Sequence, residues 1–127
     1  MTQPISIEFN TEIPDDVVWD EDGEEVVHPG GKAVADVLVA LLEEEGLSVS
    51  ELDEDLEHES WTMELEWRGA GFRLQVLHID TCYVFVHGGP WLLTRWLSRT
   101  APRQAELAAY VAGLLQTDSR FSNIRVA

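Results

Sequence analysis

The fold is decided by residues 61–79, which read WTMELEWRGAGFRLQVLHI. Apolar and polar residues alternate on both sides of the glycine-containing segment RGAG, a pattern typical of two half-buried strands joined by a turn. If the turn spans all four of these residues, Trp67 pairs with Phe72 and Glu66 with Arg73, so that one face is apolar and the other carries opposite charges. The segment therefore predicts an antiparallel hairpin that buries one face.

Further strands are expected on both sides of this hairpin. Residues Pro4 to Asn10 alternate in the same way, and Cys82 to His87 is apolar on both faces, which favours a central position in the sheet. Leu47 to Glu59 is so rich in carboxylates that it predicts an edge strand or an extended loop. Phe121 to Val126 is a candidate terminal strand.

Two main helices are expected. Apolar residues recur at helical spacing from Lys32 to Glu45, before Gly46, and again from Arg103 to Gln116. A shorter helical pattern spans residues 91–98, and the sequence DEDGEE at residues 20–25 predicts a short acidic hairpin or loop. Together these patterns predict one α+β domain over residues 1–127. Its order is strand, hairpin, helix, four strands, helix and strand, with an antiparallel sheet of about four to five strands.

The negative charge is confined to the first half of the chain. Residues 1–67 contain 21 acidic residues and one base, Lys32, whereas residues 68–127 contain three acidic residues and seven arginines. Nucleic acid is therefore not expected as a direct ligand, because phosphate binding depends on lysine and arginine. A basic protein surface is the natural complement.

Several patterns that the sequence lacks bear on the compartment of the protein and on whether it is an enzyme. It has no apolar run long enough for a membrane span and no signal-peptide pattern at its start, so a cytoplasmic protein without membrane contact is expected. The single cysteine, Cys82, lies in an apolar run and is interpreted as a buried structural thiol. No enzyme activity and no cofactor is expected.

Three possible ligand sites were weighed against structural explanations. The segment beginning at Asp20 resembles a calcium loop but lacks the closing glutamate, and the glycines before Lys32 lack the spacing of a phosphate-binding loop. The four histidines have no zinc-type spacing, although His78 and His87 could approach each other across a hairpin. Turn formation, helix initiation and ordinary core or surface positions explain these residues better, so no metal site is predicted.

Clusters of carboxylates at residues 12–25, 43–45 and 51–59 carry the functional prediction. They could serve solubility alone, or they could steer a basic partner toward the domain. Aromatic residues supply the desolvated centres of interfaces, although tryptophans are equally common in cores. The predicted partner-binding residues are Trp19, Asp20, Glu21, Asp22, Glu51, Asp53, Glu54, Asp55, Glu57, Glu59 and Trp61.

A resemblance to known proteins points in the same direction. The segment Pro29-Gly30-Gly31-Lys32-Ala33 before an apolar helix, the acidic strands, and the ending from Thr117 to Arg125 resemble small acidic bacterial α+β proteins. In general character the chain is similar to immunity proteins of polymorphic and contact-dependent toxin systems. That resemblance implies a cytoplasmic protein that binds and neutralises a basic toxin domain, such as a nuclease.

Two other functions remain open at this stage. An acidic secretion chaperone or adaptor would hold an extended partner in an apolar groove, usually as a homodimer. A DNA mimic would space its carboxylates like phosphates to occupy a nucleic-acid-binding protein. The sequence is compatible with a monomer or a homodimer.

Overall fold

The computed structural model describes residues 3–88 and 100–127 of the chain. The order of elements is the one expected from the sequence, while the short helix expected at residues 91–98 lies outside the described residues. The elements are β1 (Ile5–Thr11), β2 (Val18–Trp19), β3 (Val26–His28), α1 (Lys32–Glu44), β4 (Asp53–Asp55), β5 (Ser60–Trp67), β6 (Ala70–Ile79), β7 (Thr81–Gly88), α3 (Thr100–Gln116) and β8 (Phe121–Val126).

The main sheet is antiparallel and has six strands in the order β4-β5-β6-β7-β1-β8. It has one strand more than the upper expected number, because both the acidic strand β4 and the C-terminal strand β8 join it. As predicted, β7 is central and β4 forms an edge. The strands β2 and β3 form a separate two-stranded sheet.

The central hairpin of β5 and β6 has the predicted faces but a different register. Leu65 pairs with Phe72 and Glu64 with Arg73, so the strands are shifted by two residues from the pairing expected for a four-residue turn. The turn consists of two residues, Arg68 and Gly69, whose φ angles are 50° and 82°. Positive φ at both central positions defines the type I′ turn, whose twist matches that of a hairpin. A shift by an even number of residues preserves each face.

Arg68 adopts this positive φ angle, and its side chain makes two contacts. The guanidinium lies 5.0 Å from the centroid of the Trp67 ring and its Nη1 donates to Glu106 Oε2 on α3 at 2.5 Å. Exposed ion pairs contribute less than about 1 kcal/mol. These contacts therefore favour the two-residue turn modestly and connect it to α3.

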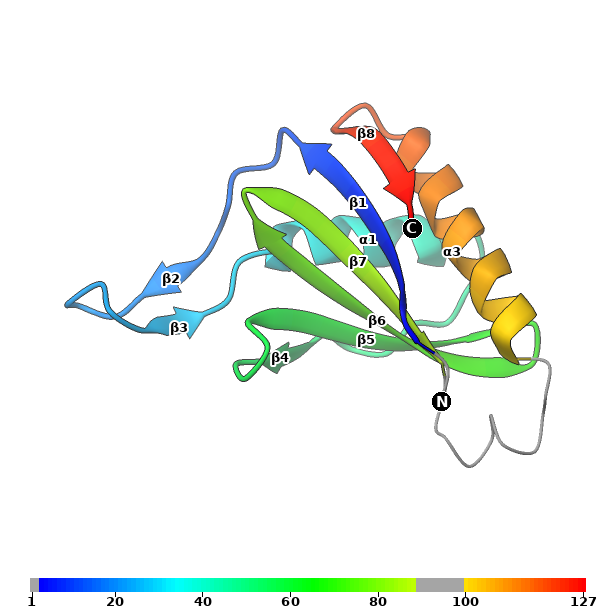
Figure 1. The fold of residues 1–127 in the computed structure, drawn as a ribbon, viewed down its shortest axis with the longest axis horizontal. Helices are drawn as coiled ribbons and strands as arrows, with labels where there is room; N and C mark the ends of the chain where they lie inside the picture. Colours follow the sequence, from blue (N-terminus) through cyan, green and yellow to red (C-terminus); the bar gives the residue numbers. More distant parts are fainter. Residues whose placement is uncertain (1–2, 89–99) are drawn as a thin grey trace.

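The helices α1 and α3 contribute to a core on one face of the sheet (Figure 1). The helix α1 buries Val34, Leu38 and Leu42 there, with Val37 and Leu41 packed against them, as the apolar periodicity predicted. Each fully buried leucine contributes roughly 1.5–3 kcal/mol through removal of its surface from water. The remaining core residues come from alternate positions of the strands, including Ile7, Met63, Leu74 and Val84.

Different capping interactions terminate the two ends of α1. At its C-terminus Gly46 has a φ of 86°, Gly46 N donates to Glu43 O, and Leu47 N donates to Leu42 O. These are the two hydrogen bonds of a Schellman motif, which confirms the expected glycine cap. At its N-terminus Gly31 has no side chain to offer as a cap, and the carboxylate of Asp16 takes that role.

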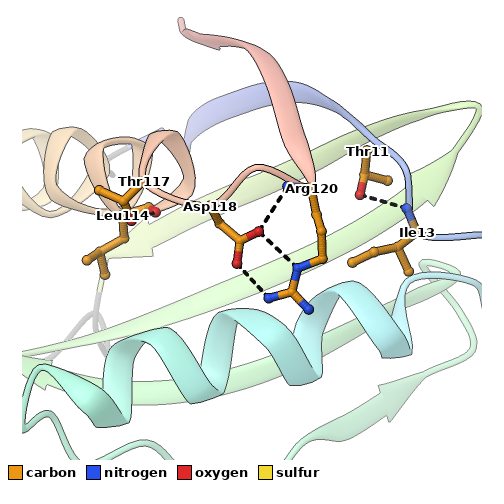
Figure 2. Close-up of polar contacts among 6 residues, drawn as sticks. All are labelled: Thr11, Ile13, Leu114, Thr117, Asp118 and Arg120. Atoms are coloured by element: carbon orange, nitrogen blue, oxygen red, sulfur yellow. Dashed lines mark hydrogen bonds and ion pairs between the residues drawn. The ribbon is translucent and has the colours of Figure 1, made fainter.

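The turn between α3 and β8 is organised by Asp118 (Figure 2). Its Oδ1 accepts hydrogen bonds from the backbone N and from Nε of Arg120, at 3.0 and 2.9 Å, and its Oδ2 accepts one from Nη2 at 2.5 Å. The hydrogen bond with the Arg120 side chain lowers the pKa of Asp118 to about 2. Arg120 O in turn accepts a hydrogen bond from Glu12 N, which connects this turn to the end of β1.

Candidate functional site

The two-stranded sheet forms an arm that extends beyond one end of the main sheet (Figure 1). We define the arm as residues 17–28. Three of its apolar side chains remain about half exposed: Val18 at 45%, Trp19 at 52% and Val27 at 43%. Large apolar groups exposed together on one projecting element are a feature of interaction sites.

Both faces of the arm carry such groups. Trp19 pairs with Val26 and Val18 pairs with His28, and the register shifts between these two pairs. Successive side chains of a strand point to opposite faces. Trp19 and Val18 therefore lie on opposite faces of the arm, and neither face is purely polar.

The tip of the arm, residues 20–25, is held by Asp20. Its Oδ1 accepts a hydrogen bond from Glu24 N at 2.8 Å, and its backbone N and O bond to Glu25 and Gly23. The hydrogen bond from the Glu24 amide is the main cause that lowers the pKa of Asp20, and the carboxylate is therefore favoured. The other acidic residues of the tip, Glu21, Asp22, Glu24 and Glu25, are exposed.

The base of the arm is fixed to the body by hydrogen bonds. Asp16 Oδ1 accepts from Gly31 N at 2.8 Å and its Oδ2 from Ala33 N at 2.9 Å. Trp61 is only 8% exposed, and its Nε1 donates to Pro29 O at 2.9 Å. Trp61 thus belongs to the core and holds the residue that follows the arm, whereas Trp19, the other predicted aromatic residue, is exposed.

The third acidic cluster adjoins the arm. His28 Nδ1 lies 2.8 Å from Glu54 Oε1, which links β3 to β4 across 26 residues of sequence. Within the turn from β4 to β5, Asp55 accepts hydrogen bonds from the ring and the backbone of His58, and the ring contact is the main cause that lowers the pKa of Asp55. Leu56 in this turn is 54% exposed.

We call the resulting region the acidic end: residues 12–28, residues 51–59 and the turn at residues 79–81. These segments lie at the end of the main sheet from which the arm extends (Figure 1). The acidic end contains 15 of the 24 acidic residues and no lysine or arginine. It also contains five of the six exposed large apolar residues of the described chain, namely Val18, Trp19, Val27, Leu56 and Ile79.

The remaining cluster, Glu43 to Glu45, is not part of this region. It lies at the C-terminal end of α1, while the arm precedes the N-terminal end. A helix of 13 residues is about 20 Å long. The structure therefore brings together two of the three clusters found in the sequence and separates the third from them.

The glycines before Lys32 do not form an anion site. The amides of Gly31 and Ala33, which would face an anion, already bind the Asp16 carboxylate. A Cβ atom at Gly30 would lie only 2.1 Å from Asp15 Oδ1. The chain thus places its own carboxylates where a phosphate would bind, in agreement with the interpretation of these glycines as helix initiation.

The histidines and the cysteine are dispersed. His78 is buried and pairs with Cys82, whereas His87 pairs with Arg73 further along the hairpin, so the two histidines do not approach each other across it. His87 instead contacts Gln75, which donates to Ser60. Among residues 3–88 and 100–127, no group of three or more histidine, cysteine, aspartate or glutamate side chains could hold a metal ion.

Cys82 has the environment of a structural thiol. It is completely buried, and burial, together with the negative charge of Asp15, raises its pKa to about 12. A nucleophilic cysteine requires the opposite shift, because the thiolate is the reactive form. The thiol of Cys82 therefore remains protonated near neutral pH.

Sequence reasoning missed two features of the acidic end. Val18 and Val27 were not among the predicted interface residues, although they are exposed, and the pairing of His28 with Glu54 was not foreseen. The first could be suspected from valines in a hairpin too short to bury them. The second depends on the path of the chain between β3 and β4, for which no local pattern exists.

In the part of the chain that the structure describes, no helix is both long and apolar enough to cross a membrane. Comparison of the chain with protein-family models, curated proteins and solved structures finds no match.

Proposed function

We propose that this chain is a non-catalytic, cytoplasmic protein-binding module whose acidic end binds a basic protein. The observation that carries the proposal is the convergence of two acidic segments, distant in sequence, with half-exposed apolar residues and no lysine or arginine among them. Carboxylates alone would explain solubility. Apolar groups among them favour an interface, because they supply the desolvated centre that the surrounding charges direct a partner toward.

The proposed partner is a basic toxin domain, such as a nuclease, which the chain would neutralise as an immunity protein. A toxin that acts on nucleic acid needs a cationic substrate site. A surface with 15 carboxylates is complementary to such a site and would exclude the substrate from it. The resemblance of the chain to immunity proteins, stated above from its sequence, supports the same partner.

The test is a pull-down from the native cell with the full chain as bait, at about 0.05 M and about 0.5 M salt, where screening differs strongly. We expect a basic protein to be retained at low salt and largely released at high salt. Expression of that protein alone should arrest growth, and co-expression of this chain should restore it.

Two charge-matched variants locate the interface. Reversal of Glu21, Asp22 and Glu24 to lysine should lower the association rate at least about tenfold, because it removes the attraction at the tip. Reversal of Glu43, Glu44 and Glu45 to lysine changes the net charge equally but lies outside the acidic end. Failure to retain any basic protein, or equal loss with both variants, would contradict the proposal.

A further inference from the structure

The structure assigns a specific binding mode to the arm: we infer that it inserts into a concave, cationic cleft of the partner protein, with its acidic tip innermost and both of its faces covered. This inference rests on the proposed function and adds the shape of the partner's site and the way it is filled. The partner's site is a protein cleft that ordinarily binds a polyanion.

The arm exposes apolar side chains on two sides. Trp19 lies on one face and Val18 on the other, and both are about half exposed. A surface that docks on a flat partner needs apolar groups on one face only. An element with exposed apolar groups on both faces buries them together only when the partner surrounds it.

The negative charge of the arm is concentrated at its tip. The tip contains five carboxylates at residues 20, 21, 22, 24 and 25, while the strands behind it contain Val18, Trp19, Val26 and Val27. An inserted arm would place the carboxylates deepest and the apolar residues at the walls. Charge complementarity therefore selects a cleft with a cationic floor, which is the chemistry of a site for phosphate-rich ligands.

The arm is held in one conformation before any partner binds. Isolated two-stranded hairpins are only marginally stable in water. Here the tip is closed by the hydrogen bonds of Asp20, and the base is fixed through Asp16, Pro29 and His28. An arm that is already ordered before binding loses little conformational entropy on insertion, and tight binding through a small element becomes feasible.

The experiment uses the basic protein that the pull-down retains and identifies by mass, purified and titrated against variants of the full chain. One variant changes the first face (Trp19→Ser), a second changes the opposite face (Val18→Ser), and Val126→Ser serves as the control. Val126 is 50% exposed and lies on β8, outside the acidic end. Because all three positions are exposed, the variants should keep the fold, which their unfolding curves would verify.

Insertion predicts a loss of affinity of at least about tenfold for each face, up to about 30-fold for Trp19→Ser, and none for the control. Photo-crosslinkers placed at residues 18 and 19 should label two different walls of one cleft. Inorganic tripolyphosphate, added at constant ionic strength, should displace the chain from the partner.

The two proposals fail in different ways. If only one face matters, or if both crosslinkers label a single flat surface, insertion is overturned while binding through the acidic end stands. If tripolyphosphate does not compete although the tip reversal abolishes binding, the cationic polyanion cleft is overturned. If no basic protein is retained, the proposed function itself falls, and the insertion falls with it.

Discussion

The carboxylate of Asp16 accepts a hydrogen bond of 2.8 Å from the backbone nitrogen of Gly31, fifteen residues later in the chain. One acidic residue of the first cluster therefore has a structural role, because it caps the helix α1 that Gly31 itself cannot cap. Among the described residues, the neighbouring carboxylates of the tip make no such contact with a helix. The acidic end thus combines residues that build the arm with residues that only present charge.

Replacement of Asp16 with alanine tests whether this carboxylate stabilises the fold while those of the tip do not. The change leaves the amides of Gly31 and Ala33 without their acceptor, and loss of a helix cap costs about 1 kcal/mol of unfolding free energy. Asp22→Ala removes the same charge from the exposed tip and should alter stability by less than about 0.5 kcal/mol. Chemical denaturation of both variants measures the difference, and equal stabilities would refute the capping role.

Replacement of two glycines with alanine should change the stability of the protein in opposite directions. Gly31 has a φ of 101°, and a Cβ atom there would lie 3.3 Å from the backbone nitrogen of His78, so Gly31→Ala should destabilise the protein by more than about 1 kcal/mol. Gly113 lies inside α3, and apart from the neighbouring backbone of this helix no atom of the described residues would lie within 4 Å of its Cβ atom. Gly113→Ala should therefore stabilise the protein by about 0.5–1 kcal/mol. Thermal unfolding of the two variants provides the comparison, and a shift of the same sign in both would contradict it.

The fold was largely predictable because its strands and helices carry strong local periodicity. The alternation in β5 and β6 identified both faces of the hairpin, and the apolar stripe of α1 identified its buried side. The register was wrong by two residues because alternation is unchanged by any even shift. Only the turn type decides between such registers, and a positive φ at Arg68 is not suggested by its residue type.

The candidate site was predictable only as a set of residues. Composition identified the three acidic clusters, but their grouping depends on tertiary contacts such as that of His28 with Glu54. The role of Trp61 was also undecided by sequence, since an indole beside a carboxylate run can face either way. Its hydrogen bond to Pro29 O is a contact between segments 32 residues apart, which no local pattern indicates.

The turn between α3 and β8 should make stability depend on pH. Hydrogen bonds from Arg120 lower the pKa of Asp118 to about 2, so the folded state favours the ionised carboxylate. The stabilisation is complete above the ordinary aspartate pKa of about 4 and is lost as the pH falls to about 2. Because Arg120 is half exposed and solvent screens its charge, we expect about 1 kcal/mol.

Asp118→Asn is the variant that isolates this contribution. It should be less stable than the parent chain at pH 7, and the difference should shrink as the pH falls from about 4 toward about 2. Urea denaturation at several pH values measures it. A difference that does not change with pH would show that the ion pair with Arg120 is not its origin.

Cys82 should be inert toward thiol reagents in the folded protein. It is completely buried in the core, and its pKa is raised to about 12, so neither access nor thiolate is available near neutral pH. Labelling with a chromogenic disulfide should proceed only through unfolding, and its rate should rise with urea in proportion to the unfolded fraction. An introduced Ser122→Cys on the exposed part of β8, with Cys82 replaced by alanine, should react rapidly at an ordinary thiol pKa of about 8.5. Rapid labelling of Cys82 without denaturant would mean that the thiol is accessible and ionised, and would reopen the question of nucleophilic chemistry in this protein.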